Sequence, residues 1–308
     1  MSLDHNAKGV YAIAATPFHD DGRLDLDSLD RLTDFYAEAG ATGITILGIM
    51  GEANKLEAEE SLEIVRRVVS RSALPIVVGV SAPGLAAMRR LAGESMALGA
   101  AGVMIAPTPA LRTDDQIRGY FDQAVEAVGR DIPWVLQDYP LTLSVVMSPG
   151  VVRDIIQANP SCVMLKHEDW PGLEKISALR RFQAEGSLRP VSILTGNGAL
   201  FLDFEMERGA DGAMTGYGFT DALVDIVRLS AAGEREAAHD LFDAHLPLMR
   251  YEQQQGVGLA VRKYVLQKRG ILTSAAQRKP GSVLSAQARA EVDYLLARVA
   301  RRDLRAAV

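Results

Sequence analysis

Short apolar segments alternate with longer amphipathic segments through about residue 230 of the chain. The apolar segments are rich in Val, Ile and Leu, and their apolar character is nearly continuous. This pattern is typical of parallel strands that are covered by helices. Eight such segments are predicted strands, at 11–18, 42–49, 75–80, 102–107, 133–140, 162–167, 191–196 and 212–216.

Helical segments are predicted between these strands. Apolar positions recur at helical spacing in segments that include 26–40, 58–72, 87–100, 117–129 and 172–186. Gly40, Gly99 and Gly209 are predicted to end helices, because glycine readily adopts the left-handed conformation found there. Ser148 and Pro149 supply a capping hydroxyl and a first-turn proline at the start of the fifth helix.

The alternation predicts an α/β fold, a (β/α)8 TIM barrel over residues 1–230. An open doubly wound sheet is the alternative, and it is disfavoured because no strand is followed by a G-x-G-x-x-G turn. After residue 230 only helical patterns occur, at 232–254, 258–270 and 285–302. Residues 231–308 are therefore predicted to form a C-terminal helical region packed on the barrel.

Composition narrows the classes of function. The chain of 308 residues is 48% hydrophobic and 23% charged, as in soluble globular proteins, and its net charge is −6. The negative charge argues against a nucleic-acid or anionic-membrane partner. No apolar run has the roughly 18 residues of a membrane span, and no secretory signal is visible. The single Cys162 excludes an internal disulfide, and we expect a cytoplasmic protein.

Lys166 stands at the end of an apolar predicted strand, whereas the other six of the seven lysines lie in predicted loops or helix surfaces. Strand alternation places Cys162, Met164 and Lys166 on one face. Inside the barrel, desolvation would favour a neutral, nucleophilic amine that can form a Schiff base with a carbonyl substrate. The alternative is a lysine that reaches solvent and pairs with Glu168 or Asp169.

Other polar or glycine-rich segments follow the predicted strands. Gly48 and Gly51 flank a short loop, and the backbone amides of Ile49 and Met50 are candidates for binding a carboxylate. The alternative is a simple tight turn, in which Glu52 pairs or caps locally.

Several other chemistries find no support in the sequence. The five histidines, at positions 5, 19, 167, 239 and 245, show no metal-ligand spacing, so no metal is expected. Strand alternation directs His167 away from Lys166, which favours a structural role. Serine-hydrolase and P-loop motifs are absent. The glutamines of RYEQQQG (250–256) offer a weak signal for a contribution to the barrel mouth.

Taken together, these motifs resemble the dihydrodipicolinate synthase / N-acetylneuraminate lyase family of class I aldolases. The resemblance covers nearly the whole chain. Its elements are the strand-6 lysine Lys166, Thr16-Pro17-Phe18, the G-x-x-G-E segment 48–52 followed by L-x-x-E-E, the G-N-G segment 196–198, G-A-D-G-A-M-T-G at 209–216 and the helical C-terminus.

The resemblance implies a Schiff base between Lys166 and pyruvate or another small 2-keto acid, with no cofactor. It also implies a homo-oligomer, a tetramer or a dimer. The residues that it places at the substrate are Thr16, Gly48, Ile49, Met50, Gly51, Glu52, Gly196, Asn197, Met214 and Thr215.

The chain departs from the family pattern at several positions. Ile49 and Met50 stand where hydroxyl residues are usual, and Gln137 stands where strand 5 usually carries a tyrosine. Tyr139 has the same strand parity as Gln137 and is the candidate to replace the missing phenol. Thr142 stands where the synthases carry an arginine. Catalytic roles are therefore predicted for Lys166, Tyr139 and Gln137.

Gln-Asp-x-Pro on strand 5 resembles the branch of the family that acts on 2-keto-3-deoxy sugar acids. The predicted function is a lyase that either dehydrates such an acid or cleaves or forms its carbon–carbon bond through the Lys166 Schiff base. Two alternatives remain. One is dihydrodipicolinate synthase proper, and the other is a non-catalytic sugar-acid binding protein on the same barrel.

Overall fold

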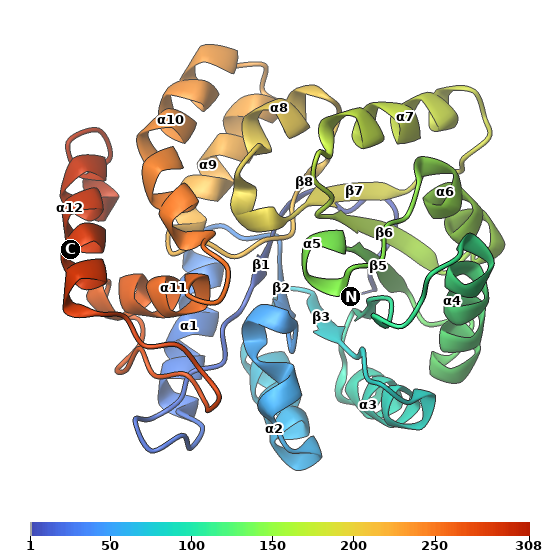
Figure 1. Ribbon diagram of the computed structural model, residues 1–308, viewed down its shortest axis with the longest axis horizontal. Coiled ribbons are helices and arrows are strands. Elements are labelled where there is room, and N and C mark those ends of the chain that lie inside the picture. The colour runs from blue at the N-terminus through green and yellow to red at the C-terminus, as the bar shows by residue number, and fades with distance from the viewer. Residues whose placement is uncertain (1) are drawn as a thin grey trace.

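A computed structural model describes residues 2–308, and it shows a closed barrel of eight parallel strands (Figure 1). Each strand pairs with its sequence neighbours, and β1 pairs with β8. The predicted (β/α)8 TIM barrel is confirmed. The strands are β1 Gly9–Ile13, β2 Gly43–Ile46, β3 Ile76–Gly79, β4 Gly102–Ile105, β5 Trp134–Asp138, β6 Cys162–His167, β7 Ser192–Thr195 and β8 Gly212–Ala213.

Helices surround the barrel, and they begin and end largely where the sequence predicts. They are α1 Leu26–Glu38, α2 Ala58–Arg71, α3 Leu85–Leu98, α4 Asp114–Val128, α5 Pro140–Leu143, α6 Pro149–Ala158, α7 Leu173–Ala184, α8 Leu202–Glu207 and α9 Thr220–Ala231. The Ser148 hydroxyl accepts a hydrogen bond from the Val151 amide and caps α6. Gly40, Gly99 and Gly209 have φ values of 79°, 105° and 96°, as helix-ending glycines do.

Every predicted strand except 162–167 extends beyond the corresponding strand of the structure, and two of these differences shape the barrel mouth. The segment 11–18 forms β1 only as far as Ile13, and the segment 212–216 forms β8 only over two residues. Beyond these points the chain turns over the barrel mouth, the end at which the carboxyl ends of the strands lie. The shortened strands therefore leave residues such as Thr16 and Thr215 in loops at the mouth.

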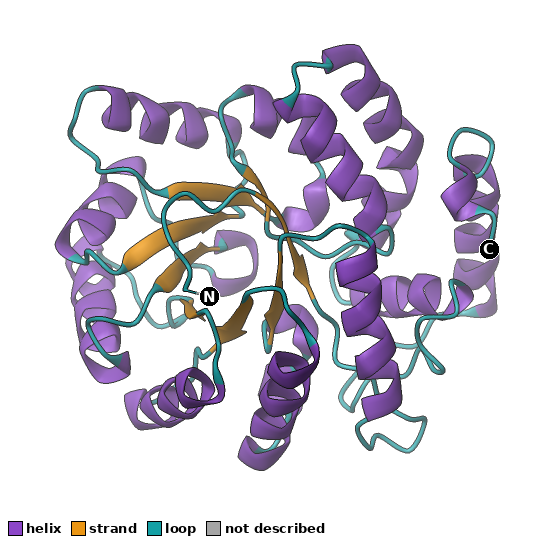
Figure 2. Cartoon of the chain, turned by 180° about the vertical axis from the view of Figure 1, so that it is seen from behind, coloured by secondary structure: helices purple, strands orange, loops and turns teal. Residues whose placement is uncertain are grey.

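Apolar side chains fill the barrel interior below Lys166. This inner layer includes Tyr11, Ile13, Val77, Met104, Val135, Met164, Leu194 and Met214, and Leu3 of the N-terminal segment packs against it. Figure 2 shows this segment crossing the barrel at the end opposite the mouth. A second apolar layer lies between the strands and the helices. Lys166 thus lies between the apolar interior of the barrel and the barrel mouth.

The alternation predicted for strand 6 fails at its first residue. The register between β5 and β6 shifts between Trp134 and Val135, which pair with Cys162 and Met164. This irregularity turns Cys162 into the outer layer beside Trp134, while Met164 stays inside. The expectation that Cys162 shares a face with Lys166 was wrong, because a bulge changes side-chain direction.

The segment after residue 231 forms α10 Arg235–Glu252, α11 Gly258–Lys268 and α12 Ala286–Val299. These helices lie beside α9 and α1 at one edge of the barrel, with α12 outermost (Figure 1). They bury a separate apolar cluster that contains Phe219, Leu248 and Val261. Within residues 2–308, no helix is long and apolar enough to cross a membrane.

Two lysines assigned to surfaces are in fact buried. Lys263 of α11 is 0% exposed and Lys175 of α7 is 6% exposed. Lys263 pairs with Glu52, and Lys175 pairs with Asp138 at 2.8 Å. The sequence suggested solvated lysines because neither partner is close in the chain.

Candidate active site

Lys166 lies at the barrel mouth in a direct ion pair. Its Nζ is 2.9 Å from Oε1 of Glu168, and the two residues are 5% and 6% exposed. Lys166 is the second-last residue of β6, and Glu168 directly follows the strand. Solvent therefore screens this ion pair weakly, and the two groups are close enough for a proton to pass between them.

Glu168 is held in place from two neighbouring strands. The Gln137 amide at the end of β5 donates to Oε1 of Glu168 at 2.7 Å, and the Asn197 backbone amide after β7 donates to Oε2 at 3.4 Å. A Cβ at Gly196 would lie 2.4 Å from Cγ of Glu168, so only glycine leaves room for this carboxylate. Two hydrogen bonds and the ammonium of Lys166 thus fix the Glu168 side chain.

Tyr139 follows Gln137 by two residues and borders the same space. It is half-buried, and burial raises the pKa of its phenol, while the Thr142 hydroxyl beside it acts in the opposite direction. The phenol is therefore protonated near neutral pH and is able to donate a proton or a hydrogen bond. Its place supports the prediction that Tyr139 and Gln137 share the mouth.

A small cavity of about 50 Å³, called here the Lys166 cavity, surrounds these groups. It joins the ends of six strands, β1, β2 and β5 to β8. Its walls are Ile13, Ile49, Met50, Gln137, Tyr139, Lys166, Glu168, Asn197, Gly198, Thr215, Gly216, Gln253 and Arg262.

The loop after β2 lines this cavity and carries unpaired backbone donors. Residues Ile49–Gly51 form one turn of 3-10 helix, and Thr16 donates from Oγ1 to the Gly51 carbonyl at 2.5 Å. The amides of Ile49 and Met50 begin this turn and donate to no carbonyl in the described part of the chain. Unpaired amides at a helix start favour a carboxylate.

Glu52 is directed away from the Lys166 cavity. Its carboxylate pairs with Lys263 of α11 and with Lys55 at 2.8 Å, and it accepts from the Arg278 amide at 3.1 Å. Its φ of 54° lies in the left-handed region. Glu52 therefore fixes the loop after β2 against the C-terminal helical region rather than lining the cavity with Lys166.

The remaining predicted substrate residues fall into two groups. Asn197 and Thr215 line the Lys166 cavity, and Gly48 lines an adjoining one. Met214 belongs to the barrel interior, and Gly51 is buried under the loop that Thr16 holds. The predicted substrate residues therefore surround the mouth, but only some of them line one of the two cavities.

The adjoining cavity, called here the side cavity, has a volume of about 410 Å³ and extends over β2 to β5. It shares Ile49 and Gln137 with the Lys166 cavity. Its walls are mostly Ala, Pro, Leu and Gly, and in the described part of the chain they include no charged side chain. Two of its hydroxyl groups are already engaged, because Ser81 accepts from the Ala106 amide and Tyr120 donates to the Ala106 carbonyl.

A cluster of charged groups lies behind β6, on the side away from Lys166. Lys175 joins Asp138 at 2.8 Å and Asp169 at 2.6 Å, and His167 is fully buried beside Asp138. Burial raises the pKa of Glu205, in the same region, to about 7. His167 does not reach the Lys166 cavity, in agreement with its predicted structural role.

The family assignment rests on a match over almost the entire chain. The family model described as the dihydrodipicolinate synthetase family matches residues 6–299. The chain belongs to this family.

Relatives within the dihydrodipicolinate synthetase family carry different activities. The chain is 29% identical to L-2-keto-3-deoxyarabonate dehydratase of Azospirillum brasilense, over 92% of each chain. It is also 29% identical to 4-hydroxy-tetrahydrodipicolinate synthase of Methylococcus capsulatus, over 78% of this chain and 85% of that one. A crystal structure of dihydrodipicolinate synthase from Rhodopseudomonas palustris shares 68% identity, with a TM-score of 0.96 over 97% of this chain and 99% of that one.

Two features of this family member escaped prediction from sequence. Glu168 was considered only as a surface partner of Lys166, although its two-residue spacing was a usable signal. Arg262 and Gly216 were not considered, and nothing local marks Arg262 among the other basic residues of α11. The weak signal from the glutamines was partly sound, because Gln253 lines the Lys166 cavity.

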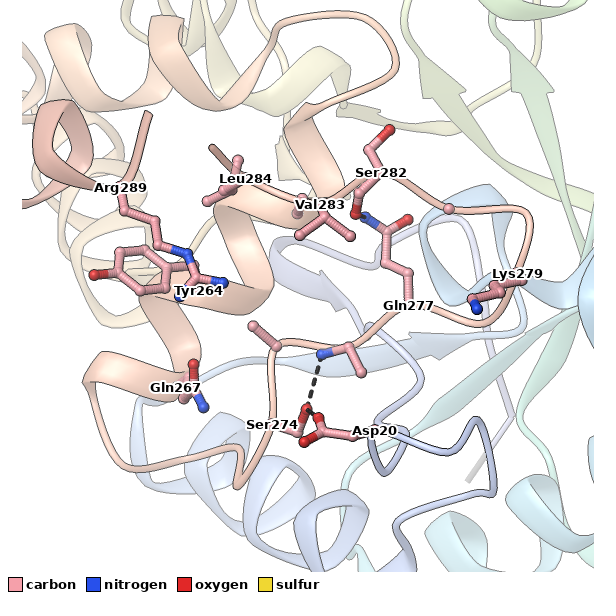
Figure 3. Close-up of a pocket in the computed structure, with 14 residues that line it drawn as sticks. Asp20, Tyr264, Gln267, Ser274, Gln277, Lys279, Ser282, Val283, Leu284 and Arg289 are labelled. Carbon is pink, nitrogen blue, oxygen red and sulfur yellow. Dashed lines mark hydrogen bonds between the residues drawn. The ribbon is translucent and has the colours of Figure 1, made fainter. Parts of the chain in front are cut away.

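Another cavity, of about 390 Å³, lies between α11 and the segment that follows it (Figure 3). Tyr264, Gln277 and Arg289 point toward it, and none of the predicted site residues lines it. Within residues 2–308, no three His, Cys, Asp or Glu side chains gather as a metal site would require. The Lys166 cavity and the side cavity therefore form the candidate active site of this family member.

Proposed function

We propose that this protein is a lyase that acts on a 2-keto acid through a Schiff base on Lys166. The single observation that carries the proposal is the buried pair of Lys166 and Glu168 at 2.9 Å. An amine that must become neutral and a carboxylate that can take its proton lie side by side at the mouth of the barrel. Such a pair supplies both the nucleophile and the acid–base group that imine chemistry needs.

In the first stage, the Lys166 ammonium transfers a proton to Glu168. The neutral amine adds to C2 of the keto acid and forms a carbinolamine. Glu168 then returns the proton to the departing hydroxyl group, so that water leaves and a protonated imine remains. The balance is one ammonium and one ketone to one iminium and one water, and Glu168 begins and ends as a carboxylate.

In the second stage, the iminium withdraws electrons from C3. Glu168 removes a proton from C3, which gives an enamine. Return of the electron pair expels the hydroxyl group at C4 as water, with the proton supplied by Glu168. In the aldol alternative a base instead removes the proton of the C4 hydroxyl, and the C3–C4 bond breaks. Tyr139, whose phenol stays protonated, is placed to assist either departure.

The side cavity argues against dihydrodipicolinate synthase proper. That synthase condenses pyruvate with aspartate semialdehyde, which carries an ammonium and a carboxylate at neutral pH. A charged group that is removed from water needs a partner of opposite charge. The described walls of the side cavity offer none, and Thr142 stands where the synthases carry an arginine. An uncharged end of the substrate, with hydroxyl groups at most, suits this space better.

Dehydration of a 2-keto-3-deoxy sugar acid is the reaction that we favour within the lyase proposal. It is supported by the 29% identity to a dehydratase of that class over 92% of the chain and by the uncharged side cavity. We also expect the protein to act in the cytoplasm, as a homo-oligomer and without a cofactor.

Product analysis tests this function. The wild-type protein and Lys166→Ala are incubated with a set of 2-keto-3-deoxy acids, and with pyruvate plus aspartate semialdehyde. Release of a semialdehyde or dioxo acid supports dehydration, release of pyruvate supports aldol cleavage, and consumption of aspartate semialdehyde supports the synthase. A ligand that raises the melting temperature but is never consumed would support a binding protein and contradict the lyase.

A further inference from the structure

Arg262 of α11 brings a second positive charge to the Lys166 cavity. The side chain is almost completely buried and lines this cavity together with Lys166 and Met50. Its Nε donates to Glu252 of α10, which is equally buried. Its Nη1 has no hydrogen-bond partner in the described part of the chain. Buried guanidinium nitrogens are nearly always hydrogen-bonded, so this exception calls for an explanation.

The chain makes room for this guanidinium at the end of β8. A Cβ at Gly216 would lie 2.1 Å from Nη1 of Arg262, so any other residue would displace the guanidinium. Gly198, after β7, is matched in the same way to Gln253, whose amide nitrogen lies where a Cβ would stand. Two strand ends are thus shaped to admit side chains from the C-terminal helical region.

The neighbours of Arg262 indicate its ligand. Gly216 and Ile13 place the guanidinium beside the ends of β8 and β1, and β1 is next to β2 in the closed barrel. Ile49 and Met50 of the loop after β2 line the same cavity, and their amides have no backbone partner in the described part of the chain. A carboxylate between them would gain two backbone donors and one cationic donor. The rest of the substrate would then extend past Gln137 into the side cavity.

We propose that Arg262 binds the carboxylate of the 2-keto acid and so determines specificity for it, a role that rests on the proposed Schiff-base function. Ile49 and Met50 lack hydroxyl groups, and Arg262 supplies the donor that they do not. Glu252 balances the guanidinium while the cavity holds no substrate. When a 2-keto acid becomes an iminium on Lys166, its carboxylate has a cation on either side. Arginine is well suited to this role because its donors match the carboxylate geometry.

The test compares pyruvate with methyl pyruvate, in which the carboxylate is masked as an ester. Trapping of the imine by borohydride is measured against ligand concentration, with the adduct at Lys166 quantified by mass spectrometry. The variant is Arg262→Gln combined with Glu252→Gln, so that no buried charge loses its partner. The concentration of pyruvate for half-maximal trapping should rise about 10- to 100-fold, as for the loss of a hydrogen bond to a charged group. The value for methyl pyruvate should not change.

Two further variants separate recognition from folding. Gly216→Ala keeps both charges but displaces the guanidinium, and it should reduce the preference for pyruvate in the same direction. Arg269→Gln is the matched control, since Arg269 directly follows α11 and pairs with Asp221 outside the Lys166 cavity. It should leave the preference unchanged. Circular dichroism and melting curves establish that each variant is folded.

The outcomes separate this role from the proposed function. No adduct at Lys166 in the wild-type protein with either ligand would overturn the Schiff-base function. Adducts in the wild-type protein, with the preference for pyruvate unchanged in the double variant, would overturn the role of Arg262 alone. An equal loss for both ligands would assign Arg262 to stability rather than recognition and would also overturn it.

Discussion

Replacing Glu168 with glutamine removes one charge from the site and almost no volume. In the wild-type protein the Glu168 carboxylate forms an ion pair with Lys166 at 2.9 Å and accepts a hydrogen bond from Gln137 at 2.7 Å. At 2.9 Å and an effective dielectric constant near 20, the attraction between two unit charges is about 6 kcal/mol. The glutamine retains hydrogen bonding to Gln137 but loses this attraction and can no longer accept a proton.

The expected result is a separation of imine formation from turnover. The Lys166 amine remains in place, so a borohydride-trappable adduct should still form, although more slowly because Glu168 no longer transfers the protons of imine formation. The later proton transfers lose their acid–base group, so kcat should fall about 10²- to 10⁴-fold. Stability should also fall, by up to about 3–5 kcal/mol if Lys166 keeps its charge without a buried partner.

The assay measures kcat under steady-state conditions and the trapped fraction of Lys166 in parallel, with urea unfolding as a check of folding. Asp169→Asn is the control, because Asp169 pairs with Lys175 and does not line the Lys166 cavity. It should keep a near-wild-type kcat. A folded Glu168→Gln protein with wild-type kcat would refute the role of Glu168 in proton transfer.

Three further predictions concern stability, reactivity and the shape of the mouth. Burial raises the pKa of Glu205 from 4.5 to about 7, so the folded state retains a proton that the unfolded state has lost between these values. Stability should therefore fall as the pH rises through this range, by about 3 kcal/mol, and urea unfolding at pH 5 and pH 8 should show a smaller fall in Glu205→Gln. Cys162 is fully buried with its pKa raised to about 12, so a thiol reagent should label it only after unfolding, and rapid labelling of the folded protein would contradict its position. Gly198→Ala would place a Cβ 1.6 Å from the amide nitrogen of Gln253 at a φ of 62°, so KM should rise, and unchanged kinetics would show that this contact is dispensable.

The fold could be predicted because its signal is local and repeated. Each apolar segment, such as 75–80 or 102–107, indicates a buried parallel strand by itself, and eight of them with helices between leave few other architectures. Lys166 could be identified for a related reason, since a lysine at the end of such a segment is exceptional. The bulge at the start of β6 could not be predicted, because it depends on the register with Trp134.

The partners of charged groups were harder to predict, because they are distant in sequence. Glu52 and Lys263 are separated by 211 residues, and α11 looks like a surface helix until its packing is known. Arg262 reaches the mouth only because Gly216 lacks a side chain and the C-terminal region folds back over β8. Periodicity describes which face of an element is apolar, but it does not describe which element will lie against that face.

Trapping of the imine at Lys166 tests the central claim most directly. The protein is treated with borohydride in the presence of pyruvate, and its peptides are mapped by mass spectrometry. The Schiff base, once reduced by borohydride, adds one pyruvic acid less one oxygen atom, and we predict this increment on the peptide that contains Lys166 and on no peptide of Lys166→Ala. Lys175 and Lys263, which are also buried, provide internal controls. An adduct on another lysine, or none with any 2-keto acid, would contradict the account.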